Sequence, residues 1–253
     1  MLFTRSIYIG VDPSAGARAI SYAALDYDLR LVALGHGDLD EVLAFVGVQT
    51  IAFVAVNAPQ RPNEGLLVEL AEQEQLTSKP TRWKDYRLAE YELWRRNIPT
   101  YKTPSRSSAC KKWMQRGFSL YQRLQTVGYQ IYPETESEKQ LMESPTTACF
   151  SVWLERSPLP KNGLEGRLQR QLKLYDLGLN IPDPMRIFEE ITRHRLLQGN
   201  FPADVLYSSG EFEAMAAAYT AWLAGNHPEG VTMLGDVNEG HIVVPVAELK
   251  QRY

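Results

Sequence analysis

The sequence has few of the residues and segments that build stapled or membrane-bound proteins. Its two cysteines, Cys110 and Cys149, form neither a Cys-x-x-Cys pair nor a longer framework, which excludes a disulfide scaffold and argues against structural zinc. No apolar run approaches the roughly 20 residues that span a bilayer, and the opening "MLFTRS" lacks the long apolar region of a signal peptide. We therefore expect a soluble, cytoplasmic protein with two buried thiols and no membrane partner.

The chain also lacks a strong net charge. It has 27 Lys and Arg against 30 Asp and Glu, a net charge of −3, so its average surface does not attract nucleic acid. The average hides an asymmetry, because residues 79–123 hold twelve Lys or Arg and only three acids. This basic segment carries +9, and the rest of the chain therefore carries −12. Eight aromatic residues interleave with its cations: Trp83, Tyr86, Tyr91, Trp94, Tyr101, Trp113, Phe118 and Tyr121.

Two interpretations of the basic segment stay open. Aromatic rings that stack on bases, combined with cations that neutralise phosphates, are typical of a nucleic-acid-binding surface. A packed helical insertion with a solvated basic face has the same composition, because tryptophans on helices are usually part of a core.

The apolar pattern of the first 59 residues predicts a sheet. Residues 6–12, 17–26 and 29–37 are short runs rich in β-branched and aromatic residues, and the tight turns between them predict three antiparallel strands. Residues 38–47 have helical spacing. Residues 50–59 are almost continuously apolar, which is typical of a parallel strand buried on both faces.

The remainder is mainly helical in pattern, with a fifth strand expected over residues 129–134. Helices are expected over residues 116–127, 164–179, 183–199 and 208–225. This order predicts a single α/β domain over residues 1–253 with a helical insertion at about 60–125. The expected architecture is a ribonuclease H-like mixed sheet, with the first three strands antiparallel, the next two parallel, and helices on both faces.

Polar side chains close three of the expected strands. Asp12, Asn57 and Glu134 follow the first, fourth and fifth strands. In open α/β sheets, ligands bind beyond the carboxyl ends of the strands, so we expect all three residues at one edge.

Several segments resemble the predicted-nuclease family with a ribonuclease H-like fold that is catalogued as domain of unknown function 429. They run from residue 8 to about 224 and comprise "GVDPSAG", "VAVNAPQRP", "YRLAEYELWRRNIPTYKTPS", "GFSLYQRLQTVGYQIYPE" and "EAMAAAYTA". By this resemblance Asp12 matches the acid that closes the first strand, and Asn57 falls where the family commonly has Asp. Glu134 follows the proline as in many members, whereas Gln130 lies where an acid is frequent.

The last expected helix contributes the remaining acid. By the resemblance, Glu213 matches the second acid of the family's Asp-x-x-Asp-Ala pattern, and Gly210 occupies the first position. Glu211 and Glu213 point about 200° apart on a helix, so both cannot face one metal. The apolar stripe of this helix does not decide which of the two acids is the ligand, and only the resemblance favours Glu213. Glu211 can instead interact with the helix dipole.

The resemblance implies hydrolysis of phosphodiester bonds by a divalent-metal-dependent nuclease. Such chemistry needs carboxylates that hold two Mg²⁺ or Mn²⁺ ions about 4 Å apart. Asp12, Glu134 and Glu213 are the expected metal ligands, and Asn57 assists through its uncharged amide oxygen. The missing charges at Asn57 and Gly210 predict a weakened site. Without the resemblance, the sequence favours Asp12 as a turn residue before Pro13, and Asn57 is equally a strand-end residue bonded to a loop.

The competing functions differ in class. Candidate phosphate-binding residues of the nuclease are Arg87, Arg95, Arg96 and Lys102. The alternative is a catalytically inactive module of the same fold that binds nucleic acid or protein. A sugar-kinase or actin-like ATPase would need a second glycine-rich phosphate loop, for which "LAGNHPEG" is a poor candidate. DNA or RNA as substrate, and the oligomeric state, are left open.

Overall fold

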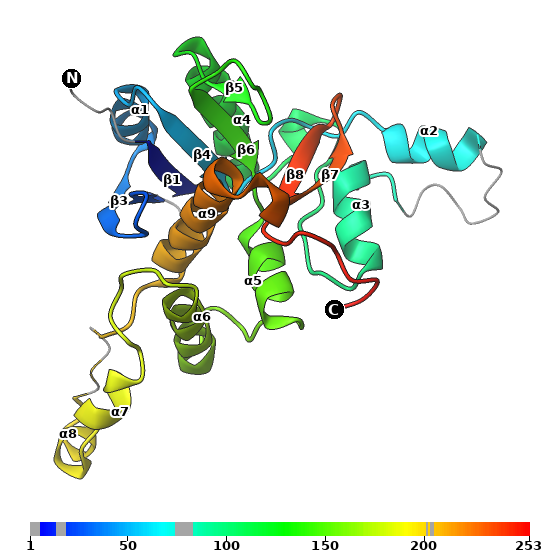
Figure 1. The fold of residues 1–253 in the computed structure, drawn as a ribbon. Coiled ribbons are helices and arrows are strands. Elements are labelled where there is room, and N and C mark those ends of the chain that lie inside the picture. The colour runs from blue at the N-terminus through cyan, green and yellow to red at the C-terminus, as the bar shows by residue number, and fades with distance from the viewer. Residues whose placement is uncertain (1–5, 14–18, 74–82, 201, 203–204) are drawn as a thin grey trace.

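A computed structural model describes residues 6–13, 19–73, 83–200, 202 and 205–253. Its strands form one mixed sheet in the order β3-β2-β1-β4-β6-β8-β7, with β5 beside β6 (Figure 1). The strands are β1 Ile7–Asp12, β2 Ile20–Leu25, β3 Leu31–Gly37, β4 Ala52–Val56, β5 Gln130–Ile131, β6 Lys139–Glu143, β7 Thr232–Asp236 and β8 Gly240–Val244. The predicted α/β class and mixed sheet are confirmed, because β1 to β3 are antiparallel while β1, β4 and β6 are parallel.

Helices lie on both faces of this sheet. They are α1 Leu39–Gly47, α2 Leu66–Gln73, α3 Leu88–Arg95, α4 Lys112–Thr126, α5 Thr146–Leu154, α6 Leu164–Asp176, α7 Arg186–Glu190, α8 Arg193–Leu197 and α9 Ser209–Asn226. Short 3-10 helices span Ser107–Ala109 and Pro228–Gly230. None of the described helices is both long and apolar enough to cross a bilayer.

Two core clusters hold the layers together. On one face, side chains of α1 and α4 pack with Ile9, Val11 and Val54 of the central strands. On the other face, α9 packs across β1, with α5 and α6 beyond it (Figure 1). The helix α4 belongs to the layer that covers the sheet, although its sequence falls at the end of the basic segment.

The close approach of α9 to β1 depends on Gly10. A Cβ at this position would overlap the backbone of α9 at Ala214 and Ala218, so only glycine lets the helix lie directly on the strand. The helix is in turn rich in alanine and buried on nearly every side. This packing, rather than a single apolar stripe, is what takes Glu213 out of water.

Three sequence expectations differ from the structure in detail. The strand expected over residues 129–134 is only Gln130–Ile131, and β6 replaces it as the long partner of β4. The helix expected over residues 183–199 is two short helices, because the β-branched pair Ile191–Thr192 interrupts it and Ile191 is extended. The hairpin of β7 and β8, which was not expected, extends the sheet beyond β6.

Candidate functional site at the carboxyl edge of the sheet

Three of the predicted site residues meet at one edge of the sheet. Asp12 ends β1, and Asn57 directly follows the parallel strand β4, where its backbone N–H donates to the carbonyl oxygen of Val11 at 2.9 Å. The helix α9, which lies on β1, brings Glu213 to the same edge. Asp12 and Glu213 are almost fully buried, with 1% and 2% exposure.

The side-chain amide of Asn57 links the two acids. Its Nδ2 donates to Oδ1 of Asp12 at 3.0 Å and to Oε2 of Glu213 at 2.9 Å. Its Oδ1 accepts from the backbone N–H of Thr146 at 3.1 Å, at the start of α5. Because a backbone N–H can only donate, it fixes which end of the amide faces the acids. The Thr146 hydroxyl also donates to Oε2 of Glu213.

One cation approaches this pair of carboxylates. Lys161, in the loop between α5 and α6, places Nζ 3.6 Å from Oε1 of Glu213. The Lys161 side chain is 40% exposed, whereas that of Glu213 is 2% exposed. The lysine therefore reaches inward from the surface. A second cation, the buried Arg170, also interacts electrostatically with Glu213.

The groups that could bind a metal here do not fit the divalent ions that the sequence resemblance implies. Asp12 and Glu213 provide two carboxylates, and the NH₂ group of Asn57 bonds to both of them where a shared cation would have to bind. Its amide oxygen, the atom that could bind a metal, is turned toward Thr146. In the part of the chain that the structure describes, no three His, Cys, Asp or Glu side chains come together as a metal site.

The comparisons with known proteins place this arrangement within a family. Residues 10–239 match the family described as "Protein of unknown function (DUF429)", a range that includes Asp12, Asn57 and Glu213. The chain belongs to this family. Comparison with the curated proteins found no match, and comparison with the solved structures found none either.

Within this family member, Glu134 does not lie with the other predicted site residues. Its backbone N–H donates to Oε1 of Gln140 at 3.0 Å, near the start of β6, and it lines a depression with Thr50 before β4. Asn57 instead follows Val56, which pairs with Glu143 at the far end of β6. The expected position was wrong because β5 ends after two residues and the chain turns back before β6 begins.

The acid that does close the parallel strand is Glu143, which sequence reasoning missed. It is fully buried at the same edge as Asn57, and its oxygens accept from the Tyr101 hydroxyl at 2.7 Å and from the Gln60 backbone N–H at 2.9 Å. Its strand, "KQLME", contains three polar residues in five and therefore gave no apolar pattern.

Arg87 was expected to hold phosphate, and its position contradicts this. The guanidinium is fully buried and donates from Nε to Oε1 of Glu90 at 2.9 Å and from Nη1 to Oε2 of Glu143 at 2.9 Å. Burial alone would lower the pKa of Arg87, but Glu143 and Glu90 together raise it well above its usual value. The arginine is an internal counter-ion, since its charge is already shared between two buried acids.

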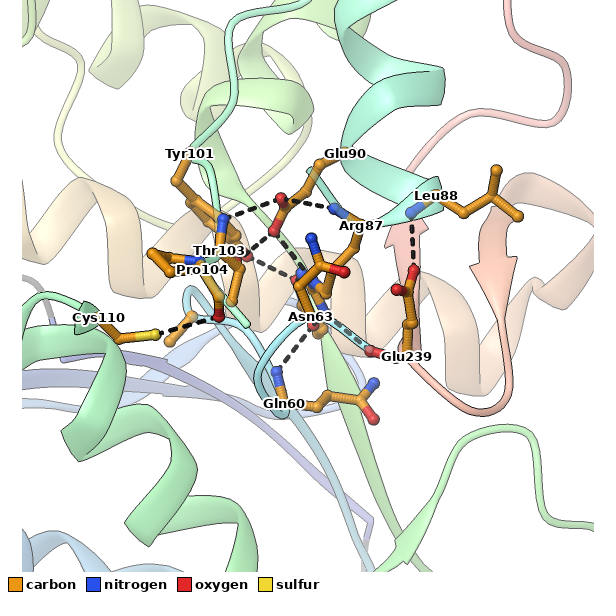
Figure 2. Close-up of polar contacts among 12 residues, drawn as sticks. Gln60, Asn63, Arg87, Leu88, Glu90, Tyr101, Thr103, Pro104, Cys110 and Glu239 are labelled. Carbon is orange, nitrogen blue, oxygen red and sulfur yellow. Dashed lines mark hydrogen bonds and ion pairs between the residues drawn. The ribbon is translucent and has the colours of Figure 1, made fainter. Parts of the chain in front are cut away.

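Figure 2 shows this buried network and the loops it connects. Glu90 faces both Arg87 and Thr103, whose backbone N–H donates to Glu90 Oε2 at 3.1 Å. Glu239, from the turn between β7 and β8, accepts from the Leu88 N–H at the start of α3 at 2.9 Å. The network therefore ties α3 to the end of the sheet, next to the Asn57 centre.

The other three predicted phosphate-binding residues form their described contacts with residues other than Asp12, Asn57 and Glu213. Arg95 and Arg96 both pair with Glu92 on α3, at 3.2 and 2.5 Å. Lys102 is exposed and places Nζ 4.9 Å from the centre of the Tyr86 ring. Of these three, Lys102 alone is a described cation without an ion pair.

Six of the eight aromatic residues of the basic segment form two groups, and the other two, Phe118 and Tyr121, belong to core clusters. Trp83, Tyr86, Tyr91 and Trp94 pack against one another, with ring centres 4.4 to 6.4 Å apart. Tyr101 and Trp113 are edge to face at 5.3 Å and line a cleft of about 380 Å³ that also contains Asn57, Lys161 and Glu213. The first group is a partly exposed ring cluster in which Tyr86 is buried and Trp94 exposed, whereas the second group borders the candidate site.

Proposed function

We propose that this protein binds nucleic acid on a ribonuclease H-like frame and that its acidic centre is occupied by the Asn57 amide in place of catalytic metal ions. The sheet order supports the frame, since three antiparallel strands are followed by two parallel partners, β4 and β6. The groups available as metal ligands around Asn57 support the absence of nuclease activity. Two carboxylates joined by an amide NH₂ lack the charge that a pair of divalent ions requires.

The observation that carries the proposal is an exposed basic surface beside the cleft. No acid occurs between Glu92 and Glu134, a stretch that contains eight Lys or Arg. Four of these are exposed and make no ion pair within the described ranges: Lys102, Arg106, Lys111 and Lys112. We refer to these four residues as the basic surface.

The start of α4 strengthens the attraction for phosphate. Lys111 is the N-cap of this helix and Lys112 its first residue, and its first turn contains no acid. Cations at a helix N-terminus are unfavourable because the helix dipole is positive there. A phosphate bound at this end would be stabilised by both the dipole and the lysines, and it would offset their repulsion.

The test is a titration of a labelled single-stranded oligonucleotide, followed by fluorescence polarisation. Contacts from four cations predict an affinity that falls roughly 50-fold when salt rises from about 50 to about 200 mM, because each phosphate contact releases counterions. Reversing Lys111 and Lys112 to Glu should weaken binding and about halve the salt slope. The matched control reverses Arg186 and Arg193 to Glu, which are exposed on α7 and α8, helices that lie far from α4 (Figure 1).

Two outcomes would overturn the proposal. Binding that does not depend on salt, or that the control weakens as much as the α4 variant, would remove the basic surface as the binding site. Cleavage of the oligonucleotide with Mn²⁺ or Mg²⁺, abolished by Asp12→Ala, would show that the Asn57 centre does accept catalytic metal.

A further inference from the structure

The cleft beside the basic surface contains polar atoms without hydrogen-bond partners. Oε1 of Glu213 and Oγ1 of Thr100 are both buried, and neither forms a hydrogen bond with the described residues. Both residues line the cleft of about 380 Å³. The Lys161 Nζ, 3.6 Å from Glu213 Oε1, is beyond hydrogen-bond length. Buried polar atoms of this kind are costly unless a ligand or water completes their bonding.

The carboxylate of Glu213 excludes a phosphate from the floor of the cleft. Asp12 and Glu213 are two buried acids joined through Asn57; Lys161 lies beside Glu213, and the buried Arg170 also interacts electrostatically with it. A phosphate placed against Glu213 would meet a carboxylate oxygen, which can only accept hydrogen bonds, in a region of low dielectric. The part of a nucleotide that suits the cleft is therefore its base.

The walls suit a planar ring. Trp113 and Tyr101 line the cleft from α4 and from the loop after α3, and stacking on such rings stabilises bases of any sequence. Trp113 follows Lys111 and Lys112 directly in the chain, so a phosphate on these lysines would lie within one nucleotide of a base on its ring.

The acceptor at the end of the cleft determines which bases fit. An ionised carboxylate accepts hydrogen bonds and donates none. Cytosine, adenine and guanine each present an amino group, and guanine adds a neighbouring ring N–H. Thymine and uracil present one N–H between two carbonyl oxygens, which the carboxylate would repel.

We propose that the cleft is a base-recognition pocket that accepts one unstacked, amino-bearing nucleobase, with Glu213 accepting from the amino group and Trp113 stacking on the ring. This inference rests on the proposed function, because the basic surface supplies the phosphate contacts. Lys161 moves aside when the base enters, as its partly exposed side chain allows.

The first experiment compares oligonucleotides that differ at one base. The probes are labelled oligo-dT and the same strand with a single central dC, dA, dG or abasic site. We expect at least about fivefold tighter binding of the amino-bearing strands than of oligo-dT, as a carboxylate contact to an amino group discriminates between bases. Glu213→Gln should reduce this preference severalfold, because the amide NH₂ that replaces a carboxylate oxygen can donate to the thymine carbonyls that the carboxylate repels.

Two further variants show whether a change in binding comes from the pocket or from misfolding. Trp113→Leu should lower the affinity for every strand, because the thymines that flank the abasic site can also stack on this ring. Trp94→Leu removes a tryptophan of the separate aromatic cluster and should keep the full base preference. Thermal unfolding of each variant shows that it is folded before binding is compared.

The pocket and the basic surface can fail separately. Equal affinity for all strands, with salt-dependent binding that Lys111 and Lys112 reversal weakens, would overturn the pocket and leave the proposed function standing. Free cytidine and uridine, which carry no phosphate, test the pocket alone through tryptophan fluorescence. Cytidine binding that Glu213→Gln abolishes supports it, and equal responses to the two nucleosides overturn it.

Discussion

Replacing Arg87 by Met tests whether the buried network holds the end of the sheet together. The substitution removes every hydrogen bond of the guanidinium and leaves Glu90 and Glu143 buried without their cation. Removing one partner of a buried ion pair costs about 3 to 5 kcal/mol, because the remaining charge is uncompensated. We expect a loss of this size in the free energy of unfolding, measured by urea denaturation at pH 7.

The same helix provides the control. Arg95 pairs with Glu92, but its side chain is 52% exposed, so Arg95→Met should cost less than about 1 kcal/mol. A loss below about 1 kcal/mol for Arg87→Met alone would refute the reasoning.

The loss in the free energy of unfolding caused by Arg87→Met should also depend on pH. Burial raises the pKa of Glu90, and Arg87 acts in the opposite direction by lowering it. In Arg87→Met this pKa therefore rises further above its value in the unfolded chain. A group whose pKa is raised in the folded state contributes stability below its unfolded pKa and loses it as pH rises through the folded value. The difference between variant and wild type should shrink as pH falls from 7 toward the ordinary pKa of Glu. A constant difference would contradict this account.

Three further predictions concern the site and its support. Asn57→Asp should lower metal-free stability by about 1 to 3 kcal/mol, because an NH₂ that satisfies two acids becomes a third acid, and it should create Mn²⁺ binding detectable by calorimetry that wild type lacks. Gly10→Ala should unfold the protein or lower its melting temperature sharply, because its Cβ meets the backbone of α9 at Ala214, whereas Gly47→Ala, at the end of α1, should be tolerated in the same thermal scan. Cys149, whose pKa burial raises to about 11, should react with a thiol reagent at pH 8 only after denaturation, and fast reaction in the folded protein would contradict its burial.

Local patterns were sufficient to predict the half of the sheet with strong apolar strands. β1, β2, β3 and β4 lie within the ranges expected from alternation and apolar runs. Because parallel strands end at one edge, the proximity of Asp12 and Asn57 also followed from the sequence. The choice of Glu213 over Glu211 needed the family resemblance. The structure supplies the physical reason, since Glu211 is held in a capping box with Ser208 at the start of α9.

Long-range packing explains what local patterns did not predict. β6 is buried on all but its first residue, yet its polar residues Gln140 and Glu143 conceal it in the sequence. Gln140 is satisfied by backbone groups of the turn just before β6, and Glu143 by Arg87, which is distant in sequence. Arg87 looked like a surface cation for the same reason. No sequence spacing indicates that it meets an acid 56 residues away. Buried polar residues are therefore where the sequence prediction failed most.

The orientation of the Asn57 amide shows how such a contact changes the chemistry of a site. From sequence, Asn57 could offer either its oxygen or its nitrogen to the neighbouring acids. The Thr146 N–H, at the start of a helix that was not predicted, takes the oxygen and leaves the NH₂ for Asp12 and Glu213. An Asp at position 57 would accept the same N–H and turn its second oxygen toward two carboxylates, which repel it unless a cation intervenes. We therefore expect residue 57, held by the backbone of α5, to determine whether this edge of the sheet binds a metal ion.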